Sequence, residues 1–334
     1  MTVFVTGGSG LIGSFLLEAL VAQGYTVKAL YRGQVPAVSV ARKVQWLEGD
    51  VLDPVMLREA LQGVQYVFHC AGLVSYAPQD SELLRQINVE GTANVVDACL
   101  EAGDVKLCHV SSIAAVGRPK GVAVLTEKNK WDQAEEHSAY ASSKYFGELE
   151  VWRGVAEGLK AVIVNPSVVL GPADWNRSST RLFRYVYNEN SFYTTGTANF
   201  VDVRDVVEAM LRLTFSEISS ERFILNAGQL EFKKFFELAA RCLGKKAPAW
   251  RVVPALAEVV WRLEHVRSLL TGAKPLITKD TARVSGKSHL FSNEKIKQAT
   301  GLEFRPVGET IGWTCSQLLQ QLPAGNQAAA ARAI

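Results

Sequence analysis

The chain has 334 residues, of which 48% are hydrophobic and 21% are charged. This composition is typical of a soluble globular protein with a sizeable core, and it excludes a disordered chain, a collagen and a coiled-coil rod. The formal net charge is only +3, and the basic residues are scattered along the sequence. We therefore expect no nucleic-acid partner.

Short β-branched runs alternate with helical patterns over the first 170 residues. Strands are predicted at Thr2–Thr6, Thr26–Tyr31, Val44–Glu48, Tyr66–Cys70, Lys106–Ser111 and Ala161–Asn165. Helices are predicted at Ile12–Gln23, Pro54–Leu61, Leu83–Ala102 and Ala139–Glu157. The strands lack clean apolar–polar alternation, as expected of parallel strands that are covered on both faces. The pattern predicts an α/β fold with a doubly wound parallel sheet, whose ligands bind at the carboxyl ends of the strands.

A glycine-rich loop, TGGSGLIG at positions 6–13, follows the first predicted strand and opens the first predicted helix. Glycine permits a tight turn at Gly7, close approach of the backbone to a pyrophosphate at Gly10, and close helix–strand packing at Gly13. The helix N-terminus offers N–H groups and a positive dipole end to phosphates. The loop predicts dinucleotide binding through Gly7, Gly10, Leu11, Ile12 and Gly13.

The end of the second strand, about 20 residues after the glycine motif, indicates which dinucleotide binds. An acid there would accept a hydrogen bond from a ribose hydroxyl, but the strand ends at Arg32, whose guanidinium suits a 2′-phosphate. We therefore expect NADP, with NAD as the alternative if Arg32 is only a solvated turn residue. After the third strand, Asp50 and Val51 are candidates for contacts with the adenine, although Asp50 would equally suit a turn.

Tyr140 and Lys144 are four residues apart on a predicted helix, so both side chains project from one face. A free phenol has a pKa near 10, and a neighbouring ammonium together with a positively charged nicotinamide would lower it toward neutrality. A hydroxyl that holds the substrate oxygen is also required. Ser111 and Ser112 lie at the end of the fifth strand, where this hydroxyl belongs.

The sequence changes character after Pro172. Seven aromatic residues fall between 174 and 200, and they favour a flat or apolar substrate, although rings in an ordinary core would give the same pattern. An amphipathic stripe at 256–270 is expected to face a core, with a dimer or membrane-surface face as the alternatives. The tail at 323–334 is expected to be flexible.

Five cysteines lie at no metal-ligand spacing, at Cys70, Cys99, Cys108, Cys242 and Cys315. His69–Cys70 and Cys108–His109 would each point to opposite faces of a strand, so neither pair presents both groups to one ion. We expect free thiols, a reducing compartment and no metal site. Neither a signal peptide nor an apolar run of the ~18 residues that span a bilayer is evident, so we expect a cytoplasmic protein without a transmembrane span.

Together these motifs resemble those of an extended short-chain dehydrogenase/reductase over residues 1–320. The matching segments are TGGSGLIG (6–13), GDV (49–51), HCAG (69–72), INVEGT (87–92), VSSI (110–113), the Tyr140–Lys144 pair, NPS (165–167) and FVDVRDV (200–206). The segments at 110–113 and 165–172 resemble the branch that contains dihydroflavonol-reductase-like and 3β-hydroxysteroid-dehydrogenase-like enzymes. The resemblance implies that Tyr140 is the general acid/base, that Ser112 holds the substrate oxygen, and that Lys144 also binds the nicotinamide ribose.

The resemblance implies further contacts with the cofactor. Ala71 and Asn88 would line its groove, and Pro166, Ser167 and Val168 would back the nicotinamide. It also implies a homodimer through the helices at 88–102 and 139–157. The domain organisation we expect is a dinucleotide-binding Rossmann domain at 1–172, its sheet completed by residues near 198–228, and a substrate-binding region at 173–322.

Three functions fit these observations. The leading hypothesis is an NADP-dependent carbonyl reductase or alcohol dehydrogenase that acts on a small apolar or aromatic substrate. The second is a nucleotide-sugar epimerase or dehydratase with tightly held NAD, in which Arg177, Arg181 and Arg184 on one helical face clamp a diphosphate. The third is a dinucleotide-binding sensor without turnover. Under the first hypothesis we expect the three arginines to face solvent or lie at the rim of the cleft, with Trp175, Phe183 and Tyr187 nearer the nicotinamide.

Overall fold

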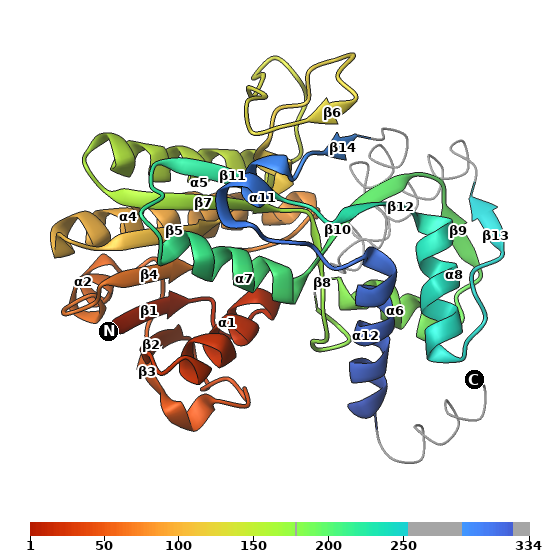
Figure 1. The fold of residues 1–334 in the computed structure, drawn as a ribbon, viewed down its shortest axis with the longest axis horizontal. Helices are drawn as coiled ribbons and strands as arrows, with labels where there is room; N and C mark the ends of the chain where they lie inside the picture. Colours follow the sequence, from red (N-terminus) through yellow and green to blue (C-terminus); the bar gives the residue numbers. More distant parts are fainter. Residues whose placement is uncertain (178, 253–288, 323–334) are drawn as a thin grey trace. The chain divides into compact units, whose positions relative to one another are not determined.

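The computed structural model describes residues 1–177, 179–252 and 289–322 (Figure 1). These residues belong to two compact units. The first comprises Met1–Ser167, Val203–Leu225 and Ser292–Glu303. The second comprises the described residues of Val168–Asp202, Asn226–Phe291 and Phe304–Ile334. The stripe expected at 256–270 and the tail expected at 323–334 lie outside the described residues.

The first unit is built on a seven-stranded parallel sheet with the order β11-β7-β5-β4-β1-β2-β3. Its strands are β1 (Thr2–Thr6), β2 (Thr26–Tyr31), β3 (Val44–Glu48), β4 (Tyr66–His69), β5 (Lys106–Val110), β7 (Lys160–Pro166) and β11 (Glu221–Leu225). The strand order runs outward in both directions from β1, which is the doubly wound arrangement. The predicted α/β fold is confirmed, and both ends of the six predicted strands agree with the structure to within one residue.

The edge strand β11 is held by side chains from elsewhere in the first unit. Glu127 accepts a hydrogen bond from the Ile224 N–H at 2.8 Å. Lys295, on α11 (Glu294–Thr300), donates to the Arg222 carbonyl oxygen at 2.8 Å. These bonds satisfy backbone groups that an edge strand otherwise leaves unpaired.

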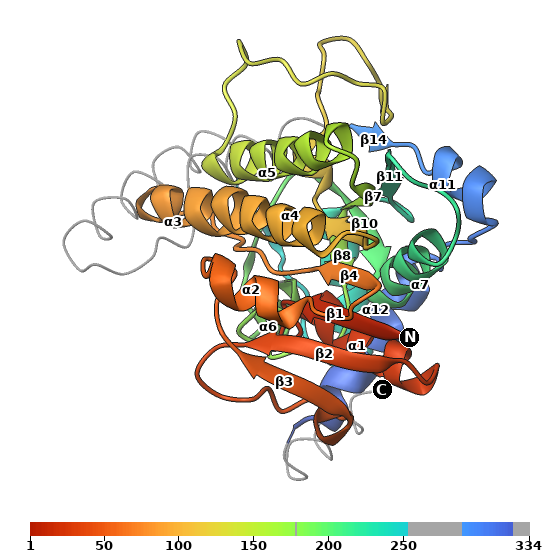
Figure 2. The ribbon, with the colours of Figure 1, turned by 90° about the vertical axis from the view of Figure 1, so that its left-hand side faces the viewer.

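Helices cover both faces of this sheet (Figure 2). One face carries α2 (Pro54–Ala60), α4 (Gly91–Ala102) and α5 (Ala139–Ala156), and the other carries α1 (Leu11–Ala22), α7 (Val203–Thr214) and α11. The core beneath the first group contains Phe4, Leu57, Val96, Leu107 and Val151, each fully buried. Short elements complete the unit: α3 (Ser81–Arg85), β6 (Val124–Leu125) and 3₁₀ turns at Ala41–Lys43, Pro78–Asp80 and Ile113–Ala115.

The helix predicted at Leu83–Ala102 is interrupted. A π-helical turn at Gln86–Glu90 separates α3 from α4. Its middle residue, Asn88, lies against Gly147 of α5, where a Cβ would come within 2.2 Å of the Asn88 carbonyl oxygen. Such turns occur frequently at functional sites, because they redirect one side chain of an otherwise regular helix.

The second unit has its own core. Its three-stranded sheet pairs β10 (Thr197–Asp202) with β8 (Val168–Leu170) in parallel and with β12 (Gly228–Glu231) antiparallel. The remaining elements are α6 (Thr180–Tyr187), β9 (Phe192–Thr194), α8 (Phe232–Leu243), β13 (Trp250–Val252), β14 (Leu290–Phe291) and α12 (Val307–Gln320). The Phe183 and Phe200 rings lie about the Phe235 ring with centroids 5.3 and 5.2 Å from it, and all three side chains are fully buried.

Candidate active site

The glycine-rich loop turns from β1 into α1 with no room for side chains. Gly7 has a φ of +71°, and a Cβ there would lie 2.5 Å from the Ala71 nitrogen. At Gly13 a Cβ would lie 2.1 Å from the Gly7 carbonyl oxygen. Gly10 is the N-cap residue immediately before α1, and no side-chain hydrogen bond caps this helix end. The backbone N–H groups of the first turn are therefore suited to bind a diphosphate.

A hydrogen-bonded chain behind the loop joins β1, β4 and α4. Thr92 Oγ1 donates its proton to the Asn88 carbonyl oxygen at 2.8 Å, so it accepts from His69 Nε2 at 3.1 Å. His69 Nδ1 is then the acceptor for Thr6 Oγ1 at 2.7 Å. Thr6 Oγ1 in turn accepts from the Ala71 N–H at 3.2 Å. Burial lowers the pKa of His69 to about 3, which keeps the ring neutral, and the hydrogen bonds with Thr6 and Thr92 select this tautomer.

Tyr140 and Lys144 lie in the first two turns of α5, which begins where Ser138 Oγ accepts from the Ala141 N–H at 3.2 Å. Both side chains are buried, with exposed fractions of 9% for Tyr140 and 6% for Lys144. The Lys144 ammonium donates to the Val110 carbonyl oxygen at 2.8 Å, at the end of β5. The pair predicted from its i, i+4 spacing therefore lies at the carboxyl end of the sheet.

Burial shifts the pKa of both groups. It lowers the pKa of Lys144 to about 8, against the opposing influence of Glu148 and Cys70. It raises the pKa of Tyr140, to which the nearby Tyr76 adds, while a hydrogen bond with Ser112 acts in the opposite direction. In the structure desolvation outweighs the stabilisation of the phenolate, and the lowered pKa that we expect for Tyr140 beside a bound nicotinamide stays a prediction. Tyr140 is therefore protonated at neutral pH and able to donate.

The two adjacent serines have different environments. Ser111 is buried, and its hydroxyl donates to Glu148 Oε2 at 2.9 Å. Ser112 is half-buried, accepts from the Ala114 N–H at 3.1 Å and lies within hydrogen-bonding distance of Tyr140. Because the Ser111 hydroxyl is already engaged, this arrangement favours Ser112 as the group that would hold a substrate oxygen.

Asn88 contacts the loop after β4. Its Oδ1 accepts from the Leu73 N–H at 2.7 Å, and its Nδ2 donates to the Leu73 carbonyl oxygen at 3.0 Å and to Ser143 Oγ at 2.9 Å. The side chain is 2% exposed. Asn88 therefore shapes the segment that carries Ala71, the residue expected beside it in the cofactor groove.

Arg32 and Asp50 form an ion pair at 2.9 Å, with side-chain exposures of 67% and 33%. Asp50 also accepts from the Leu52 N–H at 3.0 Å, so both interpretations of this residue, a turn former and a binding group, fit its position. Val51 is buried and packs against Gly91, so closely that a Cβ added to Gly91 would lie 2.7 Å from the Val51 side chain. Arg32 is thus held at the end of β2 and open to a ligand on its exposed side.

The end of β7 carries the residues expected behind the nicotinamide. Pro166 ends the strand, and the Ser167 N–H donates to the Leu225 carbonyl oxygen at 2.9 Å. The buried Ser167 Oγ has no hydrogen-bond partner among the described residues. Val168, 36% exposed, opens β8. These features fit a bound dinucleotide. Its carboxamide would satisfy the Ser167 hydroxyl, and its diphosphate would accept hydrogen bonds from the N–H groups at the glycine loop.

The arginines considered for a diphosphate clamp do not share one helical face, and that expectation is wrong. Arg177 precedes α6, in a turn closed by its N–H and the Asp174 carbonyl oxygen. Arg181 and Arg184 lie on the helix, and all three arginines are exposed. They face solvent, as the first hypothesis expects.

The aromatic residues of the same segment belong largely to the core of the second unit. Phe183 is fully buried there, and Trp175 packs on Tyr187 with ring centroids 5.1 Å apart. A fully buried ring has no surface to offer a substrate. Phe183 is therefore an ordinary core residue, which was the alternative considered for these rings, and the expectation that Trp175, Phe183 and Tyr187 lie nearer the nicotinamide than the arginines stays a prediction.

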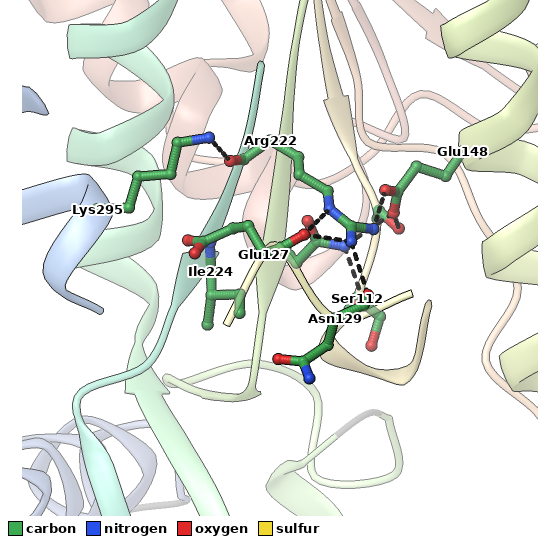
Figure 3. A network of polar contacts seen from close by, with 9 residues as sticks. Ser112, Glu127, Asn129, Glu148, Arg222, Ile224 and Lys295 are labelled. Atoms are coloured by element: carbon green, nitrogen blue, oxygen red, sulfur yellow. Dashed lines mark hydrogen bonds and ion pairs between the residues drawn. The ribbon is translucent and has the colours of Figure 1, made fainter. Parts of the chain in front are cut away.

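Two residues near Ser112, Glu148 and Arg222, were missed by the sequence interpretation, whereas Asn165 was named only as the end of a strand and as part of the NPS segment. Glu148, Asn165 and Arg222 form a buried polar network with the serines (Figure 3). Only Glu148 gave a signal, as a charged residue one turn after Lys144 on the same helix face. Arg222 is 74 positions further along the chain, and no local pattern connects it with α5.

Neither a group of metal ligands nor a membrane-spanning helix is found in the part of the chain that the structure describes. No group of three or more His, Cys, Asp or Glu side chains gathers there as metal ligands would. Among the same residues, no helix combines the length and apolar character that a membrane span requires. The five cysteines are all free thiols.

Comparisons with known proteins agree with this geometry. The family model described as "NAD dependent epimerase/dehydratase family" matches residues 3–227. A putative dihydroflavonol 4-reductase of Synechocystis sp. is 30% identical over 318 residues, covering 92% of each chain. Cinnamoyl-CoA reductase 1 of Oryza sativa subsp. japonica is 28% identical over 96% of this chain and 92% of its own.

A solved structure also covers nearly the whole chain. The crystal structure of gox2253 superposes with a TM-score of 0.81 at 30% identity, over 96% of this chain and 98% of that one. The glycine loop and the Tyr140–Lys144 pair lie within the residues that the family model matches, as do all the strands of the seven-stranded sheet except the first residue of β1. The chain belongs to the NAD-dependent epimerase/dehydratase family, the extended short-chain dehydrogenases/reductases.

Proposed function

We propose that the protein is an NADP-dependent oxidoreductase that transfers hydride between nicotinamide and a carbonyl or alcohol of a small apolar or aromatic compound. The observation that carries this proposal is the buried, protonated Tyr140, with Ser112 within hydrogen-bonding distance and Lys144 one turn away. Bound NADPH would supply the hydride. The relatives named as dihydroflavonol and cinnamoyl-CoA reductases support an aromatic carbonyl compound as the substrate.

The protein's own residues would perform the proton chemistry. Ser112 donates a hydrogen bond to the substrate oxygen and orients it, and Tyr140 transfers its proton to that oxygen as negative charge develops there. Lys144 stabilises the phenolate that remains, because its ammonium lies one turn away in the same buried region. In the direction of alcohol oxidation the same groups act in reverse.

Turnover tests this mechanism directly. A panel of aromatic and aliphatic aldehydes and ketones is offered with NADPH, and oxidation of the cofactor is followed by absorbance. Tyr140→Phe should lower kcat by about 100-fold or more while leaving NADPH binding nearly unchanged, because only the proton donor is lost. Tyr145→Phe is the matched control, since Tyr145 lies on the same helix but stacks on Trp131. Full activity of Tyr140→Phe on any substrate would refute the mechanism.

The choice of NADP over NAD rests on Arg32. A charge-assisted contact with a 2′-phosphate is worth about 1.5–3 kcal/mol, and the exposure of Arg32 favours the lower end, or about a tenfold preference for NADPH over NADH. Arg32→Asp should abolish or reverse this preference in a fluorescence titration. Arg58→Gln is the control, because Arg58 is in a similarly exposed ion pair with Glu101. Equal affinities of the unmutated protein for the two cofactors would contradict the assignment.

A homodimer is part of the proposal. The expected interface uses the helices at 88–102 and 139–157, and on the second of these Phe146 and Leu149, three residues apart, expose 43% and 40% of their surface. Apolar side chains on this helical face suit an interface between two copies of the chain. Phe146→Lys should lower the mass measured by light scattering to that of a monomer. An unmutated protein that is already monomeric at micromolar concentration would refute this part.

A further inference from the structure

A buried carboxylate lies next to the proposed proton-donating residues without being one of them. Glu148, on α5, is 1% exposed. Its Oε2 accepts from Ser111 Oγ and from Asn165 Nδ2, both at 2.9 Å, and its Oε1 pairs with the Arg222 guanidinium at 2.9 Å (Figure 3). A buried charge costs several kcal/mol unless its hydrogen-bonding capacity is satisfied, and three donors satisfy this one.

The network orients the backbone of the serine that would hold the substrate. Asn165 uses the same amide nitrogen to donate to Glu148 and, at 3.0 Å, to the Ser112 carbonyl oxygen. Ser111, the preceding residue, is bound to the same Glu148 carboxylate through its hydroxyl. The end of β5 is therefore held at two consecutive residues by groups that converge on Glu148.

Arg222 extends the network to the turn that precedes α5. This turn, Thr126–Asn129, is closed by the Asn129 N–H and the Thr126 carbonyl oxygen at 3.1 Å. The Arg222 guanidinium donates to the Glu127 carbonyl oxygen from Nε at 3.1 Å and from Nη2 at 2.5 Å, and to the Asn129 carbonyl oxygen at 3.1 Å. The planar fork of the arginine presents donors on three separate nitrogens, which reach the Glu148 carboxylate and both carbonyl oxygens at once.

We infer that Glu148 and Arg222 are positioning residues, whose ion pair sets Ser112 and the Thr126–Asn129 turn relative to Tyr140. The inference rests on the proposed function, because it concerns the geometry of the proposed proton transfer. Neither residue needs to touch the substrate. An error of about 1 Å in the position of a reacting group lowers the rate on the order of 100-fold. Hydrogen bonds that fix the backbone of Ser112 should therefore raise kcat.

Two single variants and one control test the inference. Glu148→Gln keeps the shape but removes the charge, and Arg222→Gln removes the fork. In both, kcat for NADPH-dependent reduction of 9,10-phenanthrenequinone should fall about tenfold or more, while KM and the NADPH Kd change less than about threefold. Glu150→Gln should behave as wild type, because Glu150 lies on the same helix in a more exposed ion pair with Arg153. An unchanged kcat in both single variants would overturn the inference.

A double variant separates positioning from stability. Glu148→Gln combined with Arg222→Gln leaves no unpaired charge in the interior, so urea denaturation should show that much of the stability lost in the single variants returns. The value of kcat should nevertheless remain low, because the ion pair that fixes the network around Ser112 is then absent. Recovery of kcat together with stability would show a structural role only and would overturn the inference.

Hydrogen–deuterium exchange provides a readout that needs no substrate. In both single variants, amide exchange should rise in the segments 110–113 and 126–129 and stay unchanged in the glycine loop 7–13. A uniform rise across the first unit, or no rise in either segment, would overturn the positioning role. If the unmutated protein reduced no carbonyl compound, the proposed function would fail, and the exchange pattern would still decide whether the pair orders these segments.

Discussion

Replacing Gly13 with alanine should destabilise the protein, although helix propensity alone predicts the opposite. Gly13 lies in the first turn of α1, where alanine is favoured over glycine by about 1 kcal/mol. The added Cβ would lie 2.1 Å from the Gly7 carbonyl oxygen, 2.8 Å from its carbon and 2.9 Å from the Gly8 Cα. All three are backbone atoms, so no side-chain rotation relieves the contact, and overpacking of this kind costs about 1–3 kcal/mol. Because the three contacts involve rigid backbone, we expect a steric cost near the upper end of this range, and subtracting the gain in helix propensity leaves a net loss of about 2 kcal/mol.

Dinucleotide binding should weaken in the same variant. The turn that the new Cβ displaces is closed by the Gly10 N–H and the Gly7 carbonyl oxygen at 3.0 Å, and it leads into the helix end that would bind the diphosphate. A loss of about 1.4 kcal/mol in binding corresponds to a tenfold higher Kd. Urea denaturation measures the change in stability, and a fluorescence titration with NADPH measures the change in affinity.

Gly24→Ala is the matched control, because Gly24 follows the same helix. It has a φ of +82°, and a Cβ there would meet no described atom within 4 Å. The left-handed backbone should cost alanine about 1–2 kcal/mol, with no effect on the NADPH Kd. If Gly13→Ala were as stable as the unmutated protein and bound NADPH equally well, the steric reasoning would be refuted.

Three further outcomes follow from the structure. Lys144→Met should lower turnover and weaken NADPH binding together; a variant that loses only one of the two would contradict its dual role. The pKa of His69 is about 3 in the folded protein and near 6.5 in the unfolded chain, so the stability present above pH 6.5 should be lost toward pH 3, at up to about 1.4 kcal/mol per pH unit. His69→Gln should flatten the dependence of stability on pH between pH 7 and 5, as measured by urea denaturation. An unchanged slope in this variant would contradict the reasoning. Replacing Arg177, Arg181 and Arg184 together by Gln should change carbonyl-reductase rates only a few-fold, whereas saturable binding of a uridine diphosphate sugar that the triple variant loses would favour an epimerase.

Local pattern was sufficient to predict six of the seven strands of the sheet and the glycine loop. The six predicted strands are short runs rich in β-branched and aromatic residues and bounded by turn signals, a local pattern that is typical of strands. Tyr140 and Lys144 could also be predicted, because helical periodicity alone brings i and i+4 to one face. The break in the predicted helix at Leu83–Ala102 could not, because the π turn at Asn88 packs against Gly147, which lies on another helix.

The sequence by itself determined which residues could perform the chemistry, and the tertiary structure decided the state of each. From the sequence, either Ser111 or Ser112 could hold the substrate oxygen. Only the hydrogen bond from Ser111 to Glu148 shows that the Ser111 hydroxyl is already engaged. A phenol beside an ammonium suggests a lowered pKa, yet burial raises that of Tyr140. Desolvation and pairing depend on atoms from distant parts of the chain, and Arg222 contacts Glu148 of α5 because β11 lies in the sheet. Such long-range contacts leave no periodic signal in the sequence, so only the folded chain displays them.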